Sequence, residues 1–132
     1  MSNEKTIASV FMPVKDEADF IEESLDSLVN QDFPDEKYEV LVVDGKSEDG
    51  TREIVEGYTE DYDNIRLVEN SEENVSAGRR IGVEESEGDY VIAFSGHSYA
   101  DEDFVRKLVE RLKDADEEIA GVGCRHETPE ED

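Results

Sequence analysis

The stretch Glu39-Val-Leu-Val-Val-Asp44-Gly-Lys-Ser47-Glu-Asp49-Gly-Thr51 decides the fold of this chain. Its aliphatic residues, 40–43, predict a strand that is buried on both faces, as in a parallel sheet. The run ends at Asp44, and Ser47 or Asp49 can then cap the start of a helix. A carboxylate at the carboxyl end of a buried parallel strand lies where open α/β sheets bind ligands. The alternative is that Asp44 only shapes the turn.

The same alternation of strand and helix recurs along the whole chain. Strands are predicted at residues 6–12, 38–43, 65–68, 90–94 and 119–124. Pro13 is expected to end the first strand because it cannot donate to a ladder. In the third helix, Val83 is expected to face inward, and Gly78 and Gly82 would let the helix approach a backbone or ligand closely. The pattern predicts an α/β fold with a mostly parallel sheet of about five strands and helices on both faces.

The charge of the chain restricts its partners. The 132 residues suffice for one domain, and they carry a formal net charge of −25 from 38 acidic and 13 basic residues. Such a charge repels phosphate backbones and anionic lipid surfaces, which disfavours nucleic acid and membrane surfaces as partners. Acid spread over every predicted helix suits a halophilic protein, because concentrated salt screens self-repulsion.

Cysteine content and hydropathy favour a cytoplasmic protein. The single cysteine, Cys124, allows no internal disulfide, which fits a reducing compartment. No apolar run approaches the ~20 residues that a membrane span needs, and the first residues lead directly into a strand rather than a signal peptide. We therefore expect a cytoplasmic location, including the cytoplasmic face of a membrane.

Three loops after strands are expected to converge at one edge of the sheet, at residues 13–17, 44–47 and 95–98. The adjacent residues Arg79 and Arg80 would lie beside them, at the start of the third helix. An arginine suits phosphate or the carbonyl edge of a base through its rigid fork of donors. The alternative is a surface ion pair with Glu84 or Glu85.

Several familiar sites are absent from the sequence. It contains no Walker loop, no Gly-x-Gly-x-x-Gly after the first strand and no Gly-x-Ser-x-Gly elbow. Cys124 and His126 are too few for a zinc site. The first strand ends in Met12-Pro13 rather than in acids, which disfavours a phospho-acceptor domain.

Four motifs together resemble the amino-terminal half of family 2 glycosyltransferases. They are Val10-Phe-Met-Pro-Val-Lys-Asp-Glu17, Val42-Val-Asp-Gly-Lys-Ser-Glu-Asp-Gly-Thr51, Asn74-Val-Ser-Ala-Gly-Arg79 and Gly88-Asp-Tyr-Val-Ile-Ala-Phe94. The likeness covers nearly the whole chain and implies the GT-A fold, a Rossmann-like three-layer sandwich. The loop Gly96-His97-Ser98 is similar to the succinoglycan-biosynthesis type of these enzymes.

The resemblance implies a site for a UDP- or GDP-sugar donor. Pro13 and the two residues after it would border the base and ribose, although Lys15 replaces a common tyrosine. Glu17 matches the acidic residue of the family's first loop, and Asp44 matches the aspartate that bonds the base. Arg79 matches the arginine of the Ser-Ala-Ala-Arg-Asn run.

The resemblance also implies a divalent metal, Mn²⁺ or Mg²⁺, on the diphosphate. Ser95 and His97 fall where the family carries the two ends of its Asp-x-Asp motif. A hydroxyl at Ser95 is a poor ligand for a hard cation, and an imidazole at His97 suits Mn²⁺ better than Mg²⁺. For His97, a hydrogen bond to substrate is an equal alternative.

These implications define the function that we expect. Residues 1–132 would form a single nucleotide-sugar-binding GT-A domain, truncated at its carboxyl end, with the catalytic base beyond Asp132. The chain would belong to an inverting glycosyltransferase that acts on a polysaccharide, lipid or glycan, and would be inactive alone. The alternative is a non-catalytic nucleotide-sugar-binding or assembly module. The open edge of the sheet is expected to allow self-association.

Overall fold

The computed structural model describes residues 6–95 and 98–115 as a layered α/β fold. The elements in chain order are β1 (Ala8–Val14), α1 (Ile21–Val29), the 3-10 helix η1 (Asp35–Lys37), β2 (Tyr38–Asp44), α2 (Thr51–Asp61), β3 (Ile65–Glu69), α3 (Val75–Glu85), β4 (Tyr90–Ala93) and α4 (Phe104–Ala115). The predicted strand at 119–124 lies outside the described residues. Within them, no helix is both long and apolar enough to cross a membrane.

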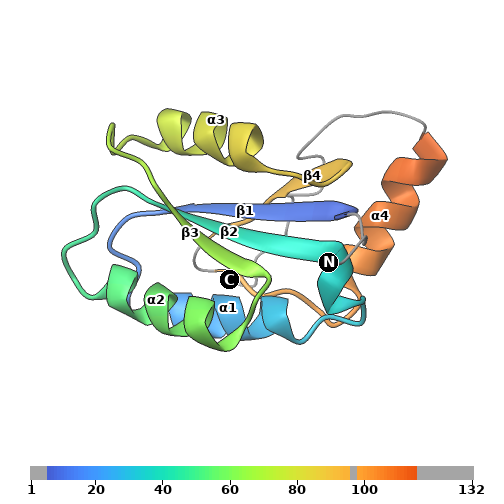
Figure 1. Cartoon of the computed structure of the whole chain (residues 1–132), viewed down its shortest axis with the longest axis horizontal. Coiled ribbons are helices and arrows are strands. Elements are labelled where there is room, and N and C mark those ends of the chain that lie inside the picture. The colour runs from blue at the N-terminus through green and yellow to red at the C-terminus, as the bar shows by residue number, and fades with distance from the viewer. Residues whose placement is uncertain (1–5, 96–97, 116–132) are drawn as a thin grey trace.

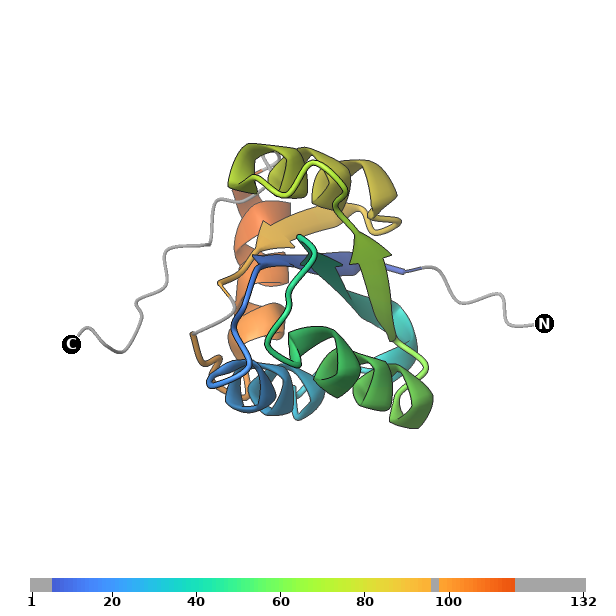
Figure 2. The ribbon, with the colours of Figure 1, turned by 90° about the vertical axis from the view of Figure 1, so that its left-hand side faces the viewer.

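The four described strands are parallel and lie in the order β3-β2-β1-β4. The chain steps outward from β1 to β3 through α1 and α2, and then returns through α3 to β4. Helices α1 and α2 therefore cover one face of the sheet and α3 covers the other, as Figures 1 and 2 show. The direction of the connections reverses between β1 and β4, which makes their carboxyl ends a switch point where such sheets bind ligands.

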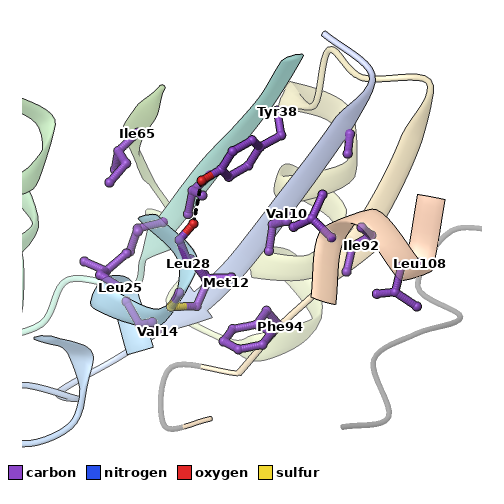
Figure 3. Close-up of a cluster of buried hydrophobic side chains, with 14 of the residues drawn as sticks. Val10, Met12, Val14, Leu25, Leu28, Tyr38, Ile65, Ile92, Phe94 and Leu108 are labelled. Atoms are coloured by element: carbon purple, nitrogen blue, oxygen red, sulfur yellow. Dashed lines mark hydrogen bonds between the residues drawn. The ribbon is translucent and has the colours of Figure 1, made fainter. Parts of the chain in front are cut away.

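Alternate residues of the strands fill the two faces. Val10 and Met12 of β1 pack with Leu25 of α1 and with Val105 of α4 in one buried cluster, part of which Figure 3 shows. On the opposite face, α3 lies so close to β1 that a Cβ at Gly82 would come within 2.9 Å of the Phe11 Cβ. The glycines of α3 therefore allow this helix to pack closely against the sheet.

Two sequence predictions about this region are wrong. Pro13 does not end β1, because it pairs with Val43 inside the strand. The backbone oxygen of Phe11 accepts from Phe94 N at 2.9 Å, so the polar backbone atoms of Phe11 face β4. Pro13 lies two residues further along the strand, so its nitrogen also faces the β4 side. The pairing with β4 has already ended at Phe11. Its missing N–H therefore costs no ladder bond. Val83 does not face inward, since its side chain is 47% exposed.

The carboxyl end of α1 is capped by side chains from the segments that follow it. Its last carbonyls have no partner within the helix. The Tyr38 hydroxyl donates to Leu28 O at 2.7 Å, a bond drawn in Figure 3, and Gln31 Nε2 donates to Ser27 O at 3.0 Å. Gln31 Oε1 also accepts from Val105 N at 2.8 Å, near the start of α4. One amide therefore links α1 and α4.

Candidate functional site

The loops after β1 and β2 are joined by side-chain to backbone hydrogen bonds at the carboxyl edge of the sheet. Asp16 N donates to Ser47 Oγ at 2.7 Å, and Glu48 N donates to Asp16 Oδ1 at 2.8 Å. Ala18 N donates to Asp49 Oδ2 at 3.1 Å. The sequence predicted Ser47 or Asp49 as a helix cap. In the structure both side chains accept hydrogen bonds from the backbone of the loop after β1, and they thereby fix that loop against the loop after β2.

The start of α2 completes this junction. Asp49 Oδ1 accepts from Thr51 N at 3.1 Å and from the Thr51 hydroxyl, and Glu17 N donates to Thr51 Oγ1 at 2.9 Å. The hydrogen bond from Thr51, followed by backbone N–H donors, holds the pKa of Asp49 below its usual value. The junction is therefore built around an ionised carboxylate, and it fixes the backbone of Glu17 beside the edge.

Asp44 lies fully buried at the end of β2. Its Oδ2 accepts from Ser47 N at 3.2 Å and lies 3.9 Å from an Arg52 guanidinium nitrogen. Its Oδ1 is buried and has no hydrogen-bond partner among the described residues. Asp44 thus shapes the turn through Oδ2, and its Oδ1 is left as an acceptor without a donor among the described residues.

A bridge of ion pairs spans the loops after β1, β2 and β3. Lys15 Nζ lies 3.2 Å from Glu73 Oε1 and donates to Gly45 O at 3.0 Å, while Lys46 Nζ lies 3.7 Å from Glu73 Oε2. One carboxylate therefore faces two ammonium groups, and we call Lys15, Lys46 and Glu73 the lysine bridge. The hydrogen bond to Glu73 raises the pKa of Lys15 above its usual value.

Unusual backbone angles concentrate in these same loops. The described non-glycine residues with positive φ are Asp16 (57°), Lys46 (66°) and Glu73 (68°). L-residues adopt this region rarely, and such residues cluster at functional sites. Sequence reasoning missed Glu73, because no pattern distinguishes it among the chain's 38 acidic residues.

The two adjacent arginines of α3 differ in their surroundings. Arg80 forms an ion pair with Glu72 at 2.6 Å. The side chain of Arg79 is exposed and makes no hydrogen bond or ion pair with any residue that the structure describes. The alternative of a pair with Glu84 or Glu85 is not realised for either arginine in the described structure. Arg79 lies in the first turns of α3, close to Gly78, whose absent Cβ makes room for Pro13.

Only part of the expected metal motif lies among the described residues. Ser95 is half-buried, and its carbonyl accepts from Ser98 N at 3.2 Å. His97 lies outside the described residues. Within residues 6–95 and 98–115, no group of three or more His, Cys, Asp or Glu side chains is arranged to hold a metal ion. The described donors therefore do not make a metal site by themselves.

Two hollows lie at the other edge of the sheet, away from these residues. One of about 610 Å³ is lined mainly by residues around the amino ends of β2 and β3, including Tyr38, Glu39 and Asn64. The other, of about 920 Å³, lies between Tyr90 and Val109. Neither contains a residue of the carboxyl-edge loops. The hollows therefore lie at the amino edge of the sheet, whereas the switch point and the unpaired Arg79 make the carboxyl edge the candidate site.

The sequence also has relatives among characterised proteins. It is 32% identical over 120 residues to a dolichyl N-acetyl-alpha-D-glucosaminyl phosphate 3-beta-D-2,3-diacetamido-2,3-dideoxy-beta-D-glucuronosyltransferase of Methanococcus voltae, covering 87% of this chain and 37% of the relative. It is 32% identical over 122 residues to glycosyltransferase AglE of Haloferax volcanii, covering 92% of this chain and 40% of the relative. The chain thus spans less than half the length of these relatives.

Solved structures show the same fold. Staphylococcus aureus TarS 1-349 in complex with UDP matches with a TM-score of 0.74 and 28% identity, over 83% of this chain and 32% of the TarS 1-349 chain. A Pyrobaculum calidifontis mannosyltransferase in complex with GDP-Man and Mn²⁺ matches with a TM-score of 0.75 and 29% identity, over 83% of this chain and 33% of that protein. The family model described as glycosyl transferase family 2 matches residues 9–132. The chain therefore belongs to family 2 of the glycosyltransferases and has the GT-A fold.

Proposed function

We propose that this chain binds the nucleotide of a UDP- or GDP-sugar at the carboxyl edge of its sheet. It would thereby form the donor half of a glycosyltransferase that acts on a polysaccharide, lipid or glycan. The similar structures support this class of ligand, because TarS was solved with UDP and with UDP-GlcNAc and the mannosyltransferase with GDP-Man. The succinoglycan-like type, the single donor domain and the cytoplasmic location stay predictions from the sequence.

The unpaired Arg79 carries this proposal. A nucleotide diphosphate is a strongly anionic ligand, and a chain with net charge −25 repels it overall. Binding therefore needs a local cation that no carboxylate already neutralises. At the carboxyl edge, Arg52 faces Asp44, Glu56 and Glu69, and Arg80 faces Glu72, whereas Arg79 has no such partner in the described structure. Its planar fork suits two phosphate oxygens.

The other site residues take roles around the base and ribose in this proposal. Pro13, Lys15 and Glu17 lie at the end of β1 and in the loop after it, and would border the base and ribose. Asp44 Oδ1, which has no donor among the described residues, would accept a hydrogen bond from a base N–H. Because Asp44 has no exposed surface, a neighbouring side chain must move before a base can reach that oxygen. A carboxylate accepts hydrogen bonds only, so it favours uracil or guanine, which present an N–H beside a carbonyl.

Ser95 and His97 would lie on the diphosphate side of the donor. A divalent ion bound there would stabilise the departing nucleotide as a Lewis acid. The described residues do not supply three His, Cys, Asp or Glu ligands for such an ion. In the proposed reaction, an acceptor hydroxyl oxygen bonds to the anomeric carbon as the bond to the diphosphate oxygen breaks, with inversion. We assign the base that takes the hydroxyl proton to no residue of this chain.

Ser95 favours a second candidate, a nucleotide-sugar-binding module without turnover. The hydroxyl of Ser95 replaces a carboxylate expected to hold the metal, and hydroxyls bind hard cations poorly. Release of UDP from a UDP-sugar in the presence of Mn²⁺ separates the two candidates. Slow release above the uncatalysed rate supports an enzyme, while tight binding without release supports the module.

Thermal unfolding in molar KCl tests the proposal. We expect UDP or GDP at about 100 times its Kd to stabilise the protein by about 2.7 kcal/mol, a shift of several degrees in Tm. Arg79→Gln should abolish most of the shift. The matched control Arg111→Gln, on α4, removes the same charge from another exposed arginine and should keep it. An equal Tm shift in wild type and Arg79→Gln would show that Arg79 does not bind the nucleotide. No Tm shift with any nucleotide would refute the donor site.

A further inference from the structure

We propose that Glu73 is an internal competitor for the donor, because its carboxylate occupies the place between Lys15 and Lys46 that an oxygen of the base or ribose takes when the nucleotide binds. The inference rests on the proposed function and adds a mode of control to the same site. In this view, the lysine bridge is the closed state of the edge, and binding exchanges one acceptor for another.

The contacts of the bridge place two donors around one carboxylate. Glu73 Oε1 lies 3.2 Å from Lys15 Nζ, and Glu73 Oε2 lies 3.7 Å from Lys46 Nζ. The two carboxylate oxygens are thus divided between two ammonium groups, as acceptor oxygens of a base or ribose could be. Lys15 is fixed from a second side by the Gly45 carbonyl at 3.0 Å. The lysine would therefore keep its position after Glu73 leaves.

The bridge is also weak enough to exchange. The side chains of Lys15, Lys46 and Glu73 are 43%, 49% and 45% exposed, so water and salt reach both pairs. Exposed ion pairs each contribute little, and breaking two of them changes an equilibrium constant by a factor of roughly 2 to 30. The left-handed backbone at Lys46 and Glu73 adds strain that opening can release.

The bridge also lies over the buried carboxylate that the base is proposed to meet. Gly45 follows Asp44 directly, and a Cβ added to Gly45 would lie 3.3 Å from Glu73 O. Asn70 N donates to Asp44 O at 2.8 Å, which holds the loop of Glu73 against the end of β2. Displacing Glu73 would therefore free two cations and loosen the loop that packs on the residue next to Asp44.

Calorimetric titration of UDP and GDP in molar KCl tests this competition. Glu73→Gln should bind nucleotide about threefold to thirtyfold more tightly than wild type. The matched control is Glu110→Gln on α4, which removes the same charge from an exposed ion pair with Arg106, away from the carboxyl edge. At molar salt the Debye length is about 3 Å, so the loss of a charge that does not touch the ligand site is screened. The Glu110→Gln affinity should therefore stay within about twofold of wild type.

A Lys15→Met, Lys46→Met double variant completes the design. In that background Glu73→Gln should have no further effect, because there is no lysine pair left to release. Binding by wild type with no gain in Glu73→Gln, or an equal gain in Glu110→Gln, would overturn the competitor and leave the donor site intact. Binding by Glu73→Gln alone would support the competitor. Absence of binding by every variant would overturn the donor site and the competitor together.

Discussion

Tyr38 shows how one side chain joins the sheet to a helix. It is 2% exposed, and its hydroxyl is the partner of the Leu28 carbonyl near the end of α1. Burial, which disfavours the phenolate, raises the pKa of Tyr38 to about 12. The buried hydroxyl thus stays protonated and keeps donating at any ordinary pH.

We predict that Tyr38→Phe destabilises the protein by about 1–3 kcal/mol, because it leaves the Leu28 carbonyl without a donor. The folded-state pKa lies above the unfolded value of 10.0, so this residue's stabilising contribution is complete below pH 10 and falls as the pH rises toward about 12. Urea unfolding across that pH range measures both effects. A wild type and variant that differ by the same amount at both ends would contradict the coupling.

At the residue scale, the sequence located Asp44 correctly at a strand end but could not distinguish Glu73. A carboxylate after a buried aliphatic run is a local pattern. The lysine bridge depends on which loops meet in space, and Lys15 and Glu73 are 58 positions apart in the sequence. Whether Asp44 also binds a base stays a prediction.

At the element scale, one glycine of α3 and the glycine of α2 have opposite surroundings. A Cβ at Gly82 of α3 would approach the Phe11 ring within 2.6 Å of Cγ, whereas a Cβ at Gly57 of α2 would meet nothing within 4 Å. Gly82 therefore sets the distance between α3 and β1, and Gly57 is an exposed helix position with an avoidable entropy cost.

We predict that Gly82→Ala destabilises the protein by about 1–3 kcal/mol through overpacking, and that Gly57→Ala stabilises it by about 0.4–1 kcal/mol. The two variants add the same methyl group to two helices, so each controls for the other. Denaturant unfolding of both gives the comparison. A neutral Gly82→Ala would mean that α3 can move away from the sheet without loss.

The pattern of elements was predictable because the strands are buried on both faces and the helices have one apolar face. All four described strands lie within two residues of their expected ends. The end of β1 was wrongly predicted at Pro13, because a proline interrupts a strand only where a neighbouring strand would accept a hydrogen bond from its N–H. On the side that Pro13 faces, the pairing with β4 ends before it reaches Pro13. Strand order, which decides that point, is a tertiary property.

At the scale of the whole molecule, charge dominates. A net charge of −25 on 132 residues repels itself in dilute buffer. The ion pairs described above are mostly exposed, and they offset little of that repulsion. A halophilic origin stays a prediction.

We predict that Tm rises by several degrees when KCl is raised from about 0.1 M to about 1 M, because the Debye length falls from about 10 Å to about 3 Å. Sodium chloride should act equally, since screening depends on ionic strength. Calorimetric scans in both salts test this. A Tm that is flat or falls with salt would show that self-repulsion is not the main cost.

The location of the nucleotide is the central claim, and backbone amide NMR tests it most directly. UDP or GDP titrated into the isotope-labelled protein should shift the amides of Asp16, Gly45 and Gly78, at the carboxyl edge. The amides of Asn64 and Glu87, beside the hollow at the amino edge, should stay in place. Shifts at Asn64 and Glu87 without shifts at the carboxyl edge would contradict the account and place the ligand at the opposite end of the sheet.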